Sequence, residues 1–160
     1  MRYQGKILRI KIEGKSHSDR ISFELDGIRD GHEISLEKMD EFIQRRSAKG
    51  EDYATARKES DRLELTQGLD GSVTTGDIIK GQFKNEDTRS KDYSIFKKIP
   101  RPSHIDYAAI NKYGEDFDLA GSGEFSGRLT VALVAIGALC VQVLEQEGIY
   151  LGSHFKSIYN

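Results

Sequence analysis

The stretch LTVALVAIGALCVQVL, residues 129–144, decides the fold of this chain. Its composition predicts a helix that is apolar on nearly every side, so other parts of the protein must cover both sides of it. Gly148, a few residues further on, is typical of a helix end. The uninterrupted apolar run at 131–141 is too short to cross a bilayer. The sequence therefore predicts a buried core helix.

Alternating apolar and polar residues upstream predict strands that could cover this helix. The predicted strands are residues 6–13, 21–25, 62–69 and 77–84. A small polar loop containing His17 joins the first two, and loops held between paired strands are common places for catalytic groups. A solvent-exposed hairpin tip is the simpler interpretation of this loop alone. The turn at 71–76 lacks the Gly-Lys-Ser/Thr ending of a phosphate loop, so we predict a hairpin connection.

A second, amphipathic helix is predicted to begin after Ser35 and to run to about Arg46. Its apolar residues fall on one face, and Ser35 is a good N-cap. Arg45 and Arg46 close it, where cations complement the negative end of the helix dipole. The same pair could instead clamp an anion, because arginine makes forked contacts to phosphate or carboxylate. The sequence leaves both interpretations open.

Composition narrows the class of protein. The chain has 160 residues, 37% hydrophobic and 31% charged, with a net charge of -2. That charge argues against a general nucleic-acid binder. The single cysteine, Cys140, cannot form an internal disulfide, and the first residues lack a signal core, so we expect a cytoplasmic protein outside the membrane. Residues 149–159 alternate loosely and predict the beginning of a further strand.

Between residues 85 and 125 there is little periodicity, which in a compact domain suggests a functional site. The segment RPSHIDY, residues 101–107, follows Pro100 and contains the second proline of the chain. The two prolines stiffen this backbone, and it presents His104 between Arg101 and Asp106. Stiff backbone, a cation and an imidazole together suit an anionic ligand. A glycine-rich turn with Arg128 then leads into the core helix, whose exposed N–H groups could bind an anion.

These segments, in this order, resemble the N-terminal part of chorismate synthase, in the wording of clostridial-type members. The matching stretches are 14–18, Arg45-Arg46, 53–59, 71–76, 85–93, 101–107, 112–114 and 121–130. No one stretch is decisive, but eight in register across the whole chain are highly specific.

The resemblance implies an α+β fold, a β-α-β sandwich of the chorismate synthase type. Only the N-terminal portion would be present, with antiparallel strands packed on the long buried helix in one incomplete domain, residues 1–160. The family converts 5-enolpyruvylshikimate 3-phosphate to chorismate by anti-1,4 elimination of phosphate, in the shikimate pathway to aromatic amino acids. It requires reduced FMN, with NADPH as well in bifunctional members, and usually forms homotetramers.

The resemblance also assigns roles to residues. His104 would protonate the leaving phosphate and His17 the reduced flavin near N1, and anionic surroundings favour the imidazolium that both roles need. Substrate binding would fall to Arg46, Arg101, Ser126 and Arg128, and flavin contact to Glu124, Phe125 and Ser126. For Arg57 and Arg89, structural and functional roles stay equally open. No residue set is assigned to a metal.

Several departures from the family pattern, including Ala48, Lys49 and Asp52, limit the match, as does the length. Ser103 replaces a glycine before His104, and residues 120–124 replace a glycine run that usually ends in Arg or His. Glu124 therefore puts negative charge beside anionic ligands, and this repulsion weakens binding unless a nearby cation neutralises the charge. Family chains are about twice as long, so a complementing C-terminal chain or oligomerisation would have to complete the core. A non-catalytic binding or assembly module, or an inactive remnant, is the alternative to an active enzyme.

Overall fold

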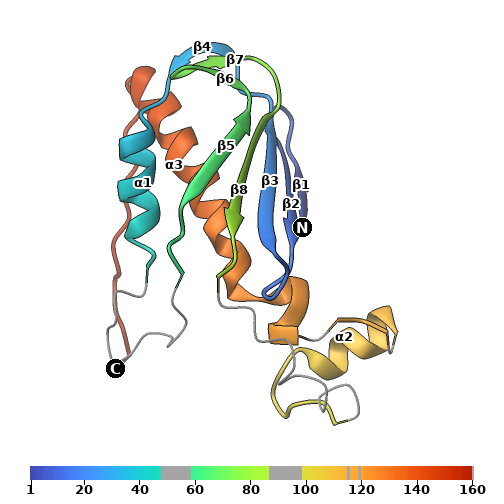
Figure 1. Cartoon of the computed structure of the whole chain (residues 1–160). Helices are drawn as coiled ribbons and strands as arrows, with labels where there is room; N and C mark the ends of the chain where they lie inside the picture. Colours follow the sequence, from blue (N-terminus) through green and yellow to red (C-terminus); the bar gives the residue numbers. More distant parts are fainter. Residues whose placement is uncertain (48–58, 87–98, 115, 119, 160) are drawn as a thin grey trace.

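The computed structural model describes residues 1–47, 59–86, 99–114, 116–118 and 120–159. Figure 1 shows a large sheet with one long helix, α3, lying across a single face and a second helix, α1, packed beside it. A small sheet closes one end, and α2 lies at the other end. This is the α+β arrangement of antiparallel strands on a long helix that the sequence predicts.

The large sheet has five antiparallel strands in the order β1-β2-β3-β8-β5. Their bounds are β1 Arg2–Gln4, β2 Arg9–Gly14, β3 Arg20–Asp26, β5 Leu63–Gln67 and β8 Ile79–Lys84. The four predicted strands are confirmed with bounds that differ by up to three residues, and β3 is longer than predicted. Strand β1 was not predicted, because three exposed residues give no alternation to detect.

Strand β3 is the centre of the sheet, and its apolar residues Ile21, Phe23 and Leu25 are at most 1% exposed. Phe23 pairs with Gly81 of β8, and a Cβ on Gly81 would meet the Phe23 ring at 2.5 Å. A glycine here lets the aromatic ring lie flat across the neighbouring strand. Full burial of such side chains contributes roughly 1.5–3 kcal/mol each, so this row stabilises the sheet against α3.

The small sheet has the order β4-β7-β6. Its strands are β4 Asp30–Glu33, β6 Leu69–Asp70 and β7 Val73–Thr75. The segment predicted as a plain hairpin connection between β5 and β8 therefore holds part of this second sheet. Buried Thr74 explains the pairing, because its hydroxyl donates to the Arg29 carbonyl at 2.7 Å and accepts from the His32 N–H at 3.0 Å.

Helix α3, Thr130–Gln146, confirms the predicted core helix. Two short 3-10 turns, η2 Ala120–Phe125 and η3 Gly127–Leu129, lead into it. By length and composition alone the stretch Gly127–Gln146 could cross a membrane, and half of that window is buried inside the protein. This stretch is longer than the apolar run at 131–141 because it also includes η3, Thr130 and the last residues of α3. The packing of α3 on α1 and β3 is that of a core helix.

Helix α1, Leu36–Gln44, begins where predicted, with the Ser35 side chain accepting the Lys38 N–H at 3.2 Å. Two glutamines one turn apart on α3 hold its start. Gln142 accepts the Ser35 N–H at 2.8 Å, and Gln146 bonds both backbone groups of Glu33 at 3.1 and 2.9 Å. The two side-chain amides bond backbone groups at the end of β4 and at the start of α1. They thereby join α3 to both α1 and the small sheet.

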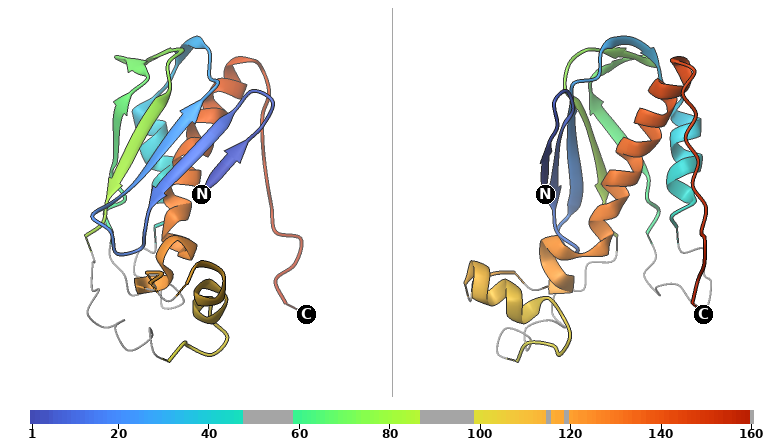
Figure 2. Two further views of the ribbon diagram at one scale, coloured as in Figure 1. Left: turned by 90° about the vertical axis from the view of Figure 1, so that its right-hand side faces the viewer. Right: turned by 180° about the vertical axis from the view of Figure 1, so that it is seen from behind.

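Two predictions outside the core were incomplete or wrong. Helix α2, Asp106–Tyr113, lies in the region without periodicity, and its low amphipathicity explains why the sequence did not reveal it. In the described part of the tail, residues 149–159, the backbone forms no strand, so that prediction is wrong. Instead the tail runs back toward the end of the molecule at which α2 lies (Figure 2). Its apolar residues are exposed.

Candidate active site

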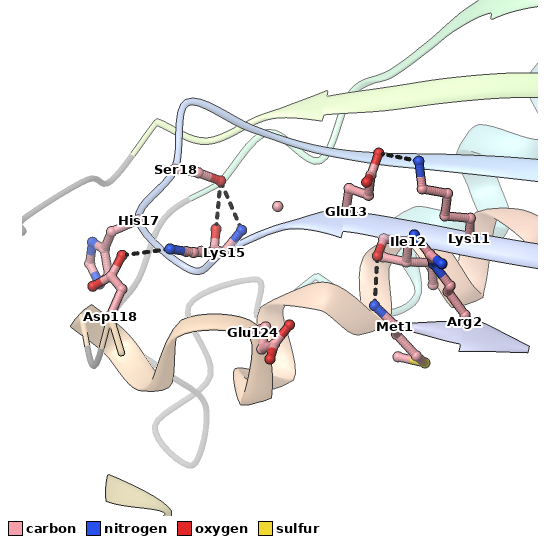
Figure 3. Close-up of a pocket in the computed structure, with 11 residues that line it drawn as sticks. Met1, Arg2, Lys11, Ile12, Glu13, Lys15, His17, Ser18, Asp118 and Glu124 are labelled. Atoms are coloured by element: carbon pink, nitrogen blue, oxygen red, sulfur yellow. Dashed lines mark hydrogen bonds and ion pairs between the residues drawn. The ribbon is translucent and has the colours of Figure 1, made fainter. Parts of the chain in front are cut away.

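The hairpin between β2 and β3 carries His17, as predicted, in the turn between two paired strands. His17 lines an open cavity of about 580 Å³ together with Glu124 and Asp118 from the segment that precedes α3 (Figure 3). Lys15 on the same hairpin reaches Asp118 at 3.2 Å. The hairpin tip is therefore packed against the η2 region and is more than an exposed loop.

The same cavity brings cations and acids together. Arg2, Lys11 and Lys15 line it on the sheet side, and Glu124 lies on the opposite side. The exposed Glu124 side chain thus lies in a cavity that also holds cationic groups. Two of these cations are already paired with other acids of the lining, Lys11 with Glu13 at 2.9 Å and Lys15 with Asp118 at 3.2 Å.

A buried ion-pair cluster joins two of the predicted substrate-binding arginines. Asp61, 2% exposed, binds Arg46 NH1 through Oδ2 at 2.8 Å and Arg128 NH1 through Oδ1. Glu59 Oε2 lies 3.6 Å from Arg128 NH2. Arg46 also reaches Thr130 Oγ1 and the Gly127 carbonyl, both at 3.3 Å.

The two arginines at the end of α1 have different surroundings. Arg45 lies over the Phe42 ring, 5.0 Å from its centroid, while Arg46 turns inward to the start of α3. Asp61 and Glu59 balance the charges of Arg46 and Arg128, so these four side chains carry no net charge. Sequence reasoning missed both acids, since they lie in a charged stretch without periodicity.

Asn85 connects the arginine cluster to the His17 hairpin. Its Oδ1 accepts from Arg128 Nε at 3.1 Å, and its Nδ2 donates to the carbonyls of Ser18 and Lys15 at 2.7 and 3.2 Å. Asn85 is 5% exposed, and its backbone N–H donates to the Asp19 carbonyl at 2.9 Å. One buried amide therefore fixes Arg128 relative to the loop that carries His17.

The Arg-Pro-Ser-His segment builds a second polar cluster at the start of α2. Asp106 is fully buried and accepts from Arg101 Nε and NH2, both at 2.7 Å, and from His104 Nδ1 at 2.7 Å. The Arg101 side chain and the other donors hold the pKa of Asp106 far below its usual range, against the opposing effect of burial. Arg101 thus contacts Asp106, and it is separate from the cluster of Arg46 and Arg128.

The η2 segment lies between the two histidines. Ser122 Oγ is 3.2 Å from His104 Nε2, and the Gly123 carbonyl accepts the N–H of Ser16, the neighbour of His17, at 3.2 Å. The residues that line the cavity include His17 but leave out His104. Both histidines thus lie beside the η2 segment. His17 lines the cavity, and His104 does not.

The predicted flavin-contacting turn has two further features. Ser126 Oγ accepts the N–H of Arg128 at 3.2 Å and so caps η3. The half-exposed Phe125 ring packs near Phe117 and Tyr113, with centroid separations of 5.7 and 6.0 Å. Glu124 thus lines the cavity, whereas these three aromatic rings lie outside its lining. Arg57 and Arg89 lie outside the described residues.

The fold is an α+β arrangement that places two histidines and several arginines near the start of a long core helix. Comparison with known proteins narrows this fold class to a family. The family model for chorismate synthase matches residues 8–160. A curated chorismate synthase of Chitinophaga pinensis is 39% identical over 96% of this chain and 46% of its own length. That of Thermococcus kodakarensis is 37% identical over 97% and 43%.

A solved structure titled as a crystal structure of chorismate synthase matches with a TM-score of 0.61 and 22% identity, over 92% of this chain and 36% of its own. That likeness supports the fold. The chain belongs to the chorismate synthase family. It spans 41–46% of the length of the first three curated relatives, so it corresponds to less than half of those proteins.

Proposed function

We propose that this chain carries the N-terminal part of the active site of chorismate synthase. That enzyme is a lyase that eliminates phosphate from 5-enolpyruvylshikimate 3-phosphate. The observation that carries the proposal is the hydrogen-bond connection of the His17 hairpin to both other clusters. Asn85 joins the hairpin to Arg128, and residues 122–123 join it to His104. Hydrogen bonds thus connect the hairpin that lines the cavity to Arg128 and His104, which both lie outside the lining.

In the proposed reaction, His104 gives a proton from Nε2 to an oxygen of the leaving phosphate, which acid catalysis typically accelerates by about 10²–10⁴-fold. Arg46 and Arg128 orient the substrate anion at the start of α3, where backbone N–H groups add positive potential. Because Asp61 and Glu59 already balance these arginines, their main contribution is geometric orientation. Arg101 and Ser126 complete the proposed substrate-binding set.

Reduced FMN is the implied cofactor, and the residues present fit it. The cavity that Glu124 lines holds cations that suit a phosphate. Phe125, the next residue in the chain, lies outside the lining and offers a half-exposed ring that suits a flavin face. Glu124, Phe125 and Ser126 would hold the flavin, and His17 would stand near its N1. When bound, the cofactor supplies electron density to the elimination. NADPH would be needed only in a bifunctional enzyme.

The proposal extends to the assembly. The exposed apolar tail at 149–159 would be covered in a homotetramer or by a complementing chain that carries the rest of the family domain. We propose a cytoplasmic enzyme, consistent with one unpaired cysteine. The same exposed tail favours a second candidate function, a non-catalytic assembly module that associates with an intact relative.

The test is phosphate release from 5-enolpyruvylshikimate 3-phosphate under anaerobic conditions with reduced FMN. The chain is assayed alone and mixed with a separate chain that carries the remaining part of the family domain. We expect release that His104→Ala lowers at least about 100-fold, while the exposed His154→Ala does not. No release in either arrangement, with flavin binding confirmed, contradicts the enzyme. Stable association with a full-length synthase without flavin binding favours the assembly module.

A further inference from the structure

The carboxylate of Asp106 accepts more hydrogen bonds than a simple ion pair provides. It accepts from the Nε, NH2 and backbone N–H of Arg101 at 2.7, 2.7 and 3.1 Å, and from His104 Nδ1 at 2.7 Å. The side chain is 0% exposed. Four donors fix the orientation of this buried carboxylate. Any rotation would break a hydrogen bond and leave a buried polar group unsatisfied.

This arrangement determines which nitrogen of His104 carries the hydrogen. An ionised carboxylate only accepts hydrogen bonds, so the ring nitrogen that faces Asp106 must be protonated. Nδ1 is that nitrogen. The neutral ring then has Nε2 as its acceptor, and the charged ring has Nε2–H as its second donor. Nε2 is therefore the atom at which His104 takes up or gives its proton.

The Ser122 hydroxyl lies at that atom, 3.2 Å from Nε2. Ser122 has a φ of 74°, in the left-handed region that a residue with a Cβ occupies only at a cost. The next residue, Gly123, is tied by its carbonyl to the backbone of the His17 hairpin. The strained backbone thus places a hydroxyl, which can accept from or donate to Nε2, against the outer side of the imidazole.

We propose that Asp106 is a positioning residue that fixes the tautomer and ring orientation of His104, with Arg101 as its clamp and Ser122 as the restraint on Nε2. The catalytic consequence rests on the proposed function, whereas the tautomer itself does not. The proposal assigns Arg101 a role through Asp106 in addition to the substrate contact that the family resemblance implies. Two of the three guanidinium nitrogens of Arg101 already face Asp106, which supports that assignment.

Nitrogen NMR of histidine-labelled protein tests the tautomer directly. The chain has four histidines, and His104→Gln identifies the signals of His104. In alkaline solution, where the rings are neutral, we expect His104 in the Nδ1–H form in the unmodified chain. A predominant Nε2–H form there overturns the proposal without the need for any variant.

Asp106→Asn supplies the second arm. Its amide presents one donor and one acceptor where Arg101 and His104 both require acceptors, so His104 should lose its preference for the Nδ1–H form. Asp26→Asn, the same change in an exposed pair with Arg9, should leave the His104 signals unchanged. Retention of the Nδ1–H preference in Asp106→Asn overturns the role of Asp106. Arg101→Lys, which keeps the carboxylate but loses the fork, is the variant to use where Asp106→Asn does not fold.

Two further measurements separate this inference from the proposed function. Where the chain turns over substrate, Asp106→Asn should lower kcat with little change in KM, by at least tenfold and up to roughly the 10⁴-fold found when a carboxylate that sets a histidine tautomer is replaced. An equal loss in kcat/KM through KM alone overturns the positioning role. Where no turnover occurs, the NMR measurement still tests the tautomer of His104, because it does not depend on enzyme activity.

The order carboxylate, imidazole, hydroxyl also occurs where serine is a nucleophile. Treatment with a fluorophosphonate distinguishes that case. We expect Ser122 to stay unlabelled by mass spectrometry, as the exposed Ser153 should. Covalent labelling of Ser122 that Asp106→Asn abolishes would make Ser122 a nucleophile and overturn its role as a restraint.

Discussion

The Nε of Arg128 donates to Oδ1 of Asn85 at 3.1 Å, and this bond ties the turn that precedes α3 to the end of β8. The other end of the same amide donates to carbonyls of the His17 hairpin. A single side chain thus fixes the distance between a proposed substrate-binding arginine and a proposed catalytic histidine.

Replacing Asn85 by alanine should lower the free energy of unfolding by roughly 2–4 kcal/mol, because Arg128 Nε and two carbonyl oxygens lose a buried partner. Urea denaturation followed by circular dichroism measures the change. Asn111→Ala is the matched control, since that amide is exposed and makes one bond to the Tyr107 carbonyl at 2.7 Å. A loss below about 1 kcal/mol for Asn85→Ala would show that the connection is not structural.

Replacing Asp61 by asparagine should cost about 3–5 kcal/mol, because two arginines lose the carboxylate that lies between them in a buried site. The substitution keeps the shape, and asparagine tolerates the left-handed φ of 49° found at this position. Thermal or urea unfolding reports the change. Asp26→Asn removes an exposed pair with Arg9 and should stay within about 1 kcal/mol. Equal losses in the two variants would contradict a special role for Asp61.

Asp106 should make stability depend on pH in acid. Its folded-state pKa lies below the ordinary value of 3.8, so its contribution is complete above that value and is lost as pH falls further. The difference in unfolding free energy between the unmodified chain and Asp106→Asn should therefore shrink as pH drops below about 3.8. Urea midpoints from pH 7 to pH 2.5 test this. A difference that stays constant over the series contradicts it.

Ser103 has a φ of 56° and an exposed side chain just before His104. Ser103→Gly should raise the free energy of unfolding by up to about 1 kcal/mol, because glycine occupies the left-handed region without steric cost. Ser103→Ala keeps the Cβ and should give no gain, which makes it the control. Differential scanning calorimetry measures both variants. A gain for alanine equal to that for glycine would exclude relief of backbone strain as the cause.

The sequence by itself determined the core helix, the four main strands, α1 with its Ser35 cap, and the family. These follow from periodicity, capping and ordered motifs, which act over short distances along the chain. These predicted elements differ from the structure only in their bounds. The tail at 149–159 is different, because loose alternation predicted a strand there and the structure has none.

The tertiary structure alone decided which charges meet. Asp61 and Glu59 lie 67 and 69 residues before Arg128, and Asn85 lies 43 residues before it, so no local pattern could pair them. Arg101 and Asp106 are the exception, because these two residues are only five apart in the chain. Electrostatic pairing depends on distance in space and on burial, and only the packed chain sets both.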